Sequence, residues 1–293
     1  MNLEAKVQNN ADARVVGDFG REWKTLDQEK LKSEELKLAF NEYFHILPLD
    51  LIDTQSEGCE MGCGSGRWAK VMAPKVGKLH RIDPSDIALE RAEPNLISAN
   101  NCRFECASVA DSTIANGSQD FGYCLGVLHH RPNTGAGLRS RTQKLKKGAP
   151  FLLYLYDRFD NKPAWFRLVW RMSDVARRFI CRRPFPVKLF VSQVIACVVY
   201  WPLSVLSRML EVLGFDVRNI PLSSYRGKPF YSLRTDALDR FGTKLEKRFT
   251  KAEIGEMMTS AGLSNIRFSD RTPYWVAVGI KTEPPYFPFR FQF

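Results

Sequence analysis

Short apolar runs alternate with longer segments of helical periodicity from Gly58 onward, which is the pattern of a sheet layered with helices. Because strand–helix–strand connections are right-handed, such a pattern predicts a parallel sheet that binds ligands beyond the carboxyl ends of its strands. The apolar runs predict five strands, over residues 56–61, 78–83, 102–107, 121–125 and 151–156. The segments between them predict helices over residues 66–74, 86–96 and 134–145.

The alternation stops after Tyr156, and residues 157–248 are helical, aromatic and basic without a strand rhythm. This segment predicts a helical cap inserted after the fifth strand. The sheet pattern then resumes, because Thr250 and Glu253 have the spacing of a capping box that opens a further helix. Two closely spaced strands, predicted to pair as an antiparallel hairpin, follow over residues 264–269 and 274–280.

The two ends of the chain have patterns of their own. Residues 15–44 predict a helix that packs an aromatic stripe on the main domain, and residues 284–293 predict an aromatic, proline-punctuated tail that packs on the body or a neighbour. The sequence therefore divides into a helical N-terminal lead-in, an α/β core, a basic cap and a segment that completes the core, over residues 1–50, 51–156, 157–248 and 249–293.

The chain has a formal charge of +11, and the excess lies mainly in the cap. Residues 157–249 contain eighteen Lys and Arg against eight Asp and Glu. A basic domain suits nucleic acid, an anionic substrate or an anionic membrane surface. The absence of a recognisable RNA-binding module or base-reading motif argues against nucleic acid.

Residues 189–207 contain no charged residue and approach the length of a membrane span. Gln193 and Pro202 interrupt this segment, and a single crossing would put the final strands on the wrong side of the membrane, so we expect no span. Two interpretations stay open. The segment forms buried helices of a substrate lid, shared with a partner subunit in a homo-oligomer, or an apolar face with a basic rim that rests on an anionic membrane.

The location predicted from the sequence is the cytoplasm, with a peripheral position at the membrane as the alternative that the cap leaves open. The polar N-terminus has no apolar signal core, which argues against secretion. The seven cysteines include no CxxC pair, which favours reduced thiols over a disulfide framework or a zinc site.

A glycine-rich turn, CEMGCGSGRW over residues 59–68, joins the first strand to its helix. It is not a P-loop, and Arg67 stands where a dinucleotide-binding motif has its third glycine. Glu60 would repel a diphosphate but would accept a hydrogen bond from an ammonium group. Asp83 ends the second strand seventeen residues beyond Gly66, where a carboxylate can accept both hydroxyls of a ribose.

This turn, taken together with three further motifs, resembles the class I S-adenosylmethionine (SAM)-dependent methyltransferases. The three motifs are RIDPS, ASVADS and LGVLHH, which begin at residues 81, 107 and 125. The resemblance covers residues 58–156 and 249–281. It implies an α/β fold with a Rossmann-like seven-stranded sheet, in which the last two strands form the hairpin. It also implies SAM as the methyl donor and S-adenosylhomocysteine as the product.

The resemblance further implies the contacts to SAM. Glu60 and the glycines of the turn would hold the methionine part, Asp83 the ribose and Pro84 the adenine. The Asp-Ala pair that often holds the adenine edge in this family is replaced here by Ser108 and Val109. Carried over by position, the residues that would bind SAM are Glu60, Gly62, Cys63, Gly64, Gly66, Asp83, Pro84, Ser108, Val109, Asp111, Leu125 and Gly126.

His129 and His130 follow the fourth strand and are candidates for a general base or for lining the cofactor pocket. Methyl transfer from a sulfonium depends mainly on positioning and desolvation, so it need not use a base. No carboxylate cluster accompanies the two histidines, which argues against a metal site. Candidate substrate contacts beneath the cap are Tyr156, Asp157, Tyr225, Arg226 and Tyr231.

The sequence thus predicts a SAM-dependent methyltransferase that acts on a small-molecule or lipid-linked acceptor. Oxygen is the favoured acceptor atom, and carbon and nitrogen stay open. One alternative is a SAM-fold protein that catalyses a non-methylating reaction such as cyclisation. The other is a non-catalytic SAM-binding or membrane-associated assembly protein.

Overall fold

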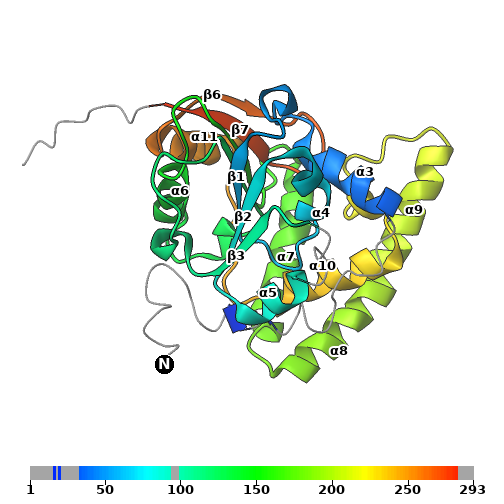
Figure 1. The fold of residues 1–293 in the computed structure, drawn as a ribbon. Helices are drawn as coiled ribbons and strands as arrows, with labels where there is room; N and C mark the ends of the chain where they lie inside the picture. The colour runs from blue at the N-terminus through cyan, green and yellow to red at the C-terminus, as the bar shows by residue number, and fades with distance from the viewer. Residues whose placement is uncertain (1–15, 18, 21–32, 94–98, 283–293) are drawn as a thin grey trace, which may run out of the picture.

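The computed structural model describes residues 16–17, 19–20, 33–93 and 99–282 of the 293-residue chain. Its strands form one seven-stranded sheet in the order β3-β2-β1-β4-β5-β7-β6 (Figure 1). Strands β1 to β5 pair in parallel, and β7 runs antiparallel to both of its neighbours. The predicted sheet with its C-terminal hairpin is confirmed. The strands are β1 Glu57–Met61, β2 Lys78–Asp83, β3 Cys102–Cys106, β4 Phe121–Leu125, β5 Pro150–Tyr154, β6 Leu263–Phe268 and β7 Val276–Lys281.

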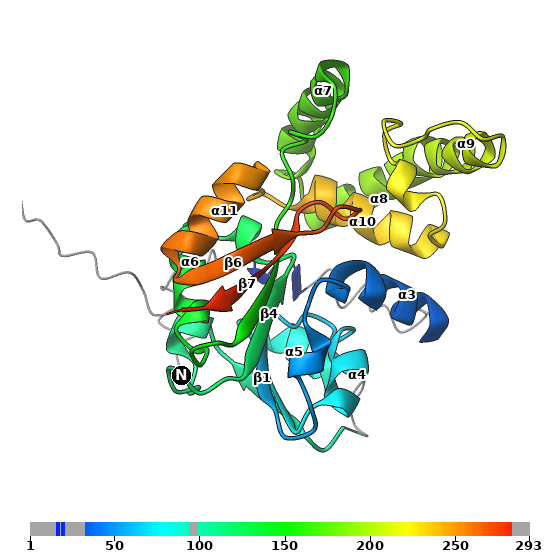
Figure 2. The same cartoon turned by 90° about the horizontal axis from the view of Figure 1, so that it is seen from above.

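Helices cover both faces of this sheet (Figure 2). On one face, Ile254 and Met258 of α11 pack with buried side chains of β1, β4 and β5. On the other face, Phe44 of α3 and Met72 of α4 pack against Tyr123 of β4. The central strands are therefore buried on both sides, which explains the nearly continuous apolar runs of β4 and β5. The core helices are α3 Ser33–Phe44, α4 Ala69–Met72, α5 Asp86–Ala92, α6 Thr134–Thr142 and α11 Lys251–Ser260.

The local signals in the sequence set several helix starts. The predicted capping box is present, because Thr250 and Glu253 satisfy each other's backbone N–H groups. The helix after β1 is shorter than predicted, and a 3-10 turn with Pro74 follows it. Of the predicted lead-in helix, residues 33–44 form α3, and most of the remainder lies outside the described residues, as does the tail over residues 284–293. The 3-10 turns are η1 Leu49–Leu51, η2 Ala73–Lys75, η4 Val109–Asp111, η5 Leu128–His130 and η7 Ser223–Tyr225.

A helical cap follows β5, as predicted. Two of its helices, α8 and α9, join through the π-helical turn η6 into one helix that spans Phe185–Val212. Pro202 cannot donate to the carbonyl of Val198, and the helix widens into the π-turn at this point. This helix is long and apolar enough to cross a membrane, and only 22% of its most apolar window is buried. The cap elements are α7 Ala164–Ile180, α8 Phe185–Ile195, η6 Ala196–Tyr200, α9 Trp201–Val212 and α10 Phe230–Gly242.

Candidate functional site

The carboxyl ends of β1, β2 and β4 meet at one cavity of about 1190 Å³. These strands are neighbours at the point where the strand order reverses, which is where open α/β sheets bind ligands. Their following loops supply one wall of the cavity, and the cap helices supply the other. A volume above the roughly 300–1,000 Å³ of ordinary ligand pockets leaves room for two molecules side by side.

The glycine turn forms a narrow part of this wall. Gly62 and Gly64 both have positive φ angles, of 88° and 51°, and a Cβ on Gly62 would lie 2.4 Å from Cγ2 of Val127. Gly126, after β4, also has a positive φ and lines the cavity, and a Cβ built on it would meet no protein atom within 4 Å. The backbone therefore leaves open space beside Gly126 where a ligand can lie against the main chain.

Asp83 stands at the end of β2 and lines the cavity. Its Oδ2 accepts from the N–H of Gly64 at 3.0 Å, and its Oδ1 accepts from the N–H of Ser85 at 2.9 Å. Burial raises the pKa of this carboxyl above its usual value, although both hydrogen bonds act in the opposite direction. A carboxylate has further lone pairs, so Asp83 can still accept from a ligand hydroxyl.

Glu60 takes a position that the sequence did not reveal. Its carboxylate is buried and accepts from Nε of Arg81 at 2.9 Å, and it does not line the cavity. Gly66 does not line the cavity either, and a Cβ on it would lie 2.6 Å from Nη2 of Arg81. Arg81 thus lies against both residues behind the turn, and the second carboxylate oxygen of Glu60, Oε1, is buried without a hydrogen-bond partner among the described residues.

The predicted adenine contacts also lie outside the cavity wall. Ser108 donates to Oδ2 of Asp111 at 2.6 Å, and the neighbouring Val109 is buried in the core. None of these three residues lines the cavity among the described residues. The remaining predicted cofactor residues do line it: Gly62, Cys63, Gly64, Asp83, Pro84, Leu125 and Gly126.

The two adjacent histidines occupy different environments. His130 lines the cavity, and its Nδ1 lies 2.7 Å from the carbonyl of Leu245. Because a carbonyl only accepts, Nδ1 carries a proton, and Nε2 is the basic nitrogen of the neutral ring. Nε2 lies 3.8 Å from Oδ1 of Asp239. His129 lies outside the cavity and is fully buried, with its ring stacked on Tyr156 at 3.7 Å.

Four of the five predicted substrate contacts, Tyr156, Asp157, Tyr225 and Arg226, line the cavity, and Tyr231 does not. Two carboxylates on α10 were not predicted: Asp236, which is hydrogen-bonded to Tyr225, and Asp239, which accepts from the hydroxyl of Tyr156. Their spacing of three residues on one helix was the available signal. The cavity lining further includes Tyr43, Trp170, Ile195, Tyr200 and Leu203.

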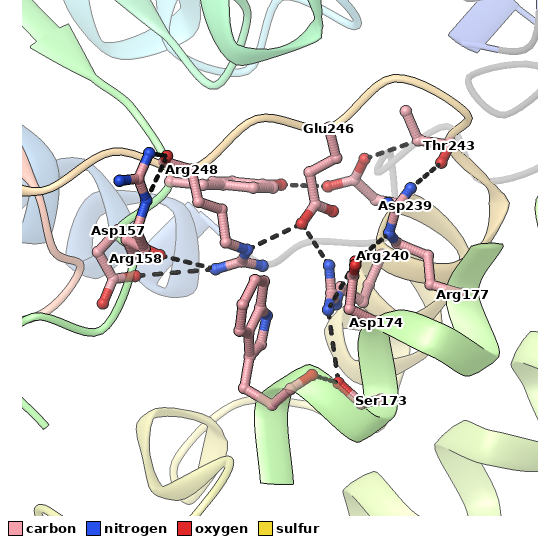
Figure 3. A network of polar contacts seen from close by, with 12 residues as sticks. Asp157, Arg158, Ser173, Asp174, Arg177, Asp239, Arg240, Thr243, Glu246 and Arg248 are labelled. Carbon is pink, nitrogen blue, oxygen red and sulfur yellow. Dashed lines mark hydrogen bonds and ion pairs between the residues drawn. The ribbon is translucent and has the colours of Figure 1, made fainter. Parts of the chain in front are cut away.

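A charged network joins the cap to the end of the sheet (Figure 3). Glu246 accepts from Nε of Arg248 at 2.8 Å and also pairs with Arg240 of α10. Arg248 donates to the backbone carbonyl of Asp157 at 3.1 Å, just beyond β5. Asp174 of α7 lies 3.7 Å from Arg240 and so extends the network to a second cap helix. This network connects helices α7 and α10 of the cap to the segment that follows β5.

Three comparisons with known proteins bear on this site. A family model described as a methyltransferase domain matches residues 32–219. The comparison with curated proteins gives no match. Among the described residues, no group of three or more His, Cys, Asp or Glu side chains is arranged to hold a metal ion.

Several solved structures match this chain at low sequence identity and with TM-scores below 0.5. A putative methyltransferase from Bacillus halodurans is 13% identical, with a TM-score of 0.48, and the match covers 78% of this chain and 71% of that one. A putative methyltransferase from Haloferax volcanii, solved in complex with a methyltransferase activator, is 12% identical, with a TM-score of 0.49 and coverage of 89% and 96%. A SAM-dependent methyltransferase from Thermotoga maritima, described as a possible histamine N-methyltransferase, is 13% identical, with a TM-score of 0.46 and coverage of 92% and 100%.

Proposed function

Because the chain belongs to the class I SAM-dependent methyltransferases, we propose that it transfers the methyl group of SAM to a hydroxyl oxygen of a small-molecule or lipid-linked acceptor. The acceptor lies in the cavity between the sheet and the cap. The observation that carries this proposal is the position of His130: its side chain lines the cavity, a hydrogen bond from Nδ1 fixes its tautomer, and Nε2 is buried without a hydrogen-bond partner among the described residues.

SAM would occupy the sheet side of the cavity, where it supplies an electrophilic methyl group on a sulfonium. Gly62, Cys63 and Gly64 would lie against its methionine part, and Asp83 would accept from its ribose. The space beside Gly126, which no protein atom fills, supports this placement. Further predicted contacts in the wall are Pro84, for the adenine, and Leu125.

The acceptor hydroxyl must lose a proton as its oxygen takes the methyl group. Nε2 of His130 would receive that proton, and the carboxylate of Asp239 at 3.8 Å would stabilise the resulting imidazolium. A neutral amine needs no such base, because its lone pair is already available to attack. A base in the wall of the cavity therefore favours oxygen over nitrogen as the acceptor atom.

The cap side of the cavity suits an apolar body with a polar end. Trp170, Ile195 and Leu203 supply apolar and aromatic surface. Burial raises the pKa of Tyr156 and of Tyr225 well above the usual value, so their hydroxyls stay protonated. They can position an acceptor hydroxyl through hydrogen bonds without competing with it as nucleophiles.

The test uses SAM with a labelled methyl group and pairs of apolar compounds that differ only in hydroxyl against amine. We expect label in the hydroxyl compound with stoichiometric S-adenosylhomocysteine. His130→Gln should lower kcat by about 10²- to 10⁴-fold, the usual contribution of a general base, with little change in the affinity for SAM.

His45→Gln is the matched control, because His45 is exposed and lies outside the cavity wall. It should retain the wild-type rate. Added imidazole should restore part of the activity of His130→Ala and not of the wild type. Equal labelling of amine and hydroxyl compounds, with unchanged kcat in His130→Gln, would overturn the assignment to oxygen and to this base.

A further inference from the structure

One face of the long cap helix carries a regular stripe of exposed apolar side chains. The members recur every three or four residues through α8, η6 and α9, so they lie on one side of the helix. Each is at least 41% exposed, and Trp201, an aromatic residue of the kind enriched at membrane interfaces, stands near the middle. The apolar stripe consists of Val187, Phe190, Val194, Val198, Trp201, Val205, Met209 and Val212.

The opposite face of this helix holds its polar residues and packs on the protein. Ser192 and Ser207 are fully buried, and Nζ of Lys188 donates to the carbonyl of Gly242 at 3.1 Å. Ala196 and Tyr200 pack in an apolar cluster with side chains of α10. This attachment along the inner face keeps the apolar stripe outward, and it holds the helix on the domain rather than across a bilayer.

Cationic side chains border the apolar stripe. Arg182 and Arg183 directly precede the helix, and Arg208 lies near its other end. All three are exposed, and within the described part of the chain none of them forms an ion pair. The acidic residue closest in sequence, Glu211, is itself paired with Arg226 at 2.7 Å. The border of the apolar stripe is therefore positively charged, because the pairing with Arg226 neutralises Glu211.

A second cap helix repeats the arrangement. Helix α7 carries exposed apolar residues at the same spacing, together with the exposed Arg171 and Arg178. Both helices project beyond the sheet on the cap side of the molecule (Figure 2). The exposed apolar residues of α7 are Trp165, Leu168, Met172, Val175 and Phe179.

We propose that the apolar stripe docks on an anionic phospholipid bilayer, with the helix lying in the interface and the arginines on the lipid phosphates. Apolar side chains enter the acyl boundary while Arg neutralises anionic headgroups, which is the chemistry of interfacial amphipathic helices. A second copy of the chain fits less well. A two-fold interface places the same patch against itself and would bring the unpaired arginines of both copies together.

The docked surface also gives the cavity access to the bilayer. Val169 of α7 and Val199 of η6 both line the cavity, and they are 47% and 41% exposed. Part of the cavity wall therefore belongs to the two cap elements that carry exposed apolar side chains, and the proposed entry route for an apolar acceptor runs between them. A membrane-resident acceptor with an apolar body would reach His130 by this route. The access route rests on the proposed function, whereas the docking itself does not.

Flotation of the full chain with vesicles tests the docking. We expect binding to phosphatidylcholine vesicles that contain phosphatidylglycerol, with affinity that falls as salt rises. Replacing Val194, Val198 and Trp201 together by serine should abolish flotation. Reversing Arg182 and Arg183 to glutamate should weaken it about tenfold or more, because each basic residue contributes separately to anionic-surface binding.

Matched controls carry the same changes elsewhere on the surface. Leu38→Ser with Leu51→Ser removes exposed apolar side chains outside the cap, and Lys75→Glu with Arg103→Glu reverses exposed charges there. Both should float as the wild type does. Calorimetry with SAM on every variant shows that the core is folded. Flotation without methyl transfer would leave the docking intact and refute the proposed function.

Two results would overturn the docking. In one, the wild type binds no vesicle, and light scattering shows that the wild type is a dimer whereas the serine variant is a monomer. The apolar stripe would then join two copies of the chain. In the other, the serine variant folds, binds SAM and floats as well as the wild type.

Discussion

Asp83 connects the second strand to the glycine turn through its two backbone hydrogen bonds. We predict that Asp83→Asn weakens SAM binding by about 1–3 kcal/mol, the usual loss when a hydrogen bond to a charged group is removed. Isothermal titration calorimetry measures this change directly. Asp111→Asn is the informative comparison, because Asp111 pairs with Ser108 outside the cavity wall and should leave the affinity unchanged. An equal loss of SAM affinity in both variants would show that the turn at Ser108 also contacts SAM.

His129 shows how a buried group couples stability to pH. Burial lowers the pKa of His129 well below its usual value, so the folded state keeps it neutral while the unfolded state binds a proton near pH 6.5. The contribution of neutral His129 to the free energy of unfolding is therefore complete above about pH 6.5. It is lost as the pH falls, by about 1.4 kcal/mol for each pH unit. His129→Phe preserves the stacking on Tyr156 and removes this loss.

The measurement is the free energy of unfolding of both proteins between neutral pH and about pH 5. As the pH falls, the free energy of unfolding of the wild type should decrease relative to that of the phenylalanine variant. A difference that stays constant over this interval would show that His129 titrates in the folded protein as it does in the unfolded chain.

At the scale of single residues, the sequence records the backbone geometry of the glycine turn more directly than the partners of its charged side chains. The glycine positions followed from a local requirement for positive φ, which a sequence motif records. The pairing of Glu60 with Arg81 joins two different strands across the sheet. Sequence spacing does not determine which of two available partners, a ligand ammonium or a buried guanidinium, such a carboxylate faces.

At the scale of elements, the prediction was accurate where burial alone sets the pattern. The predicted limits of β2 and β4 match the structure, because polar turn residues bound each apolar run. The cap was predicted as one helical segment without its individual helices. Its apolar residues face outward along α8 and α9, so periodicity alone could not separate a buried face from an exposed one. The spacing of Asp236 and Asp239 places both carboxylates on one face of α10, but that this face lines the cavity depends on tertiary packing, which the spacing does not record.

At the scale of the whole molecule, the position of the cap over the sheet depends on the buried network around Glu246. Burial by itself would raise the pKa of Glu246, but Arg248 and Arg240 outweigh it and hold the pKa below the usual value. The stabilisation from Glu246 is therefore present above the pKa of the unfolded chain, about 4.3, and is lost as the pH falls through the lower folded value. At neutral pH, the network is fully ionised and holds cap and core together.

Glu246→Gln leaves Arg240 and Arg248 buried without their shared counter-charge, and we predict a loss of about 3–5 kcal/mol in stability. Denaturant titration measures this loss, and trypsin should cleave first within residues 157–248, because the cap detaches before the sheet unfolds. Glu211→Gln is the matched control: Glu211 pairs with Arg226 at the surface, where both side chains are more than a third exposed, and its loss should stay within about 1 kcal/mol. Equal, small losses in both variants, with unchanged cleavage sites, would mean that apolar packing of α10 rather than this network holds the cap on the core.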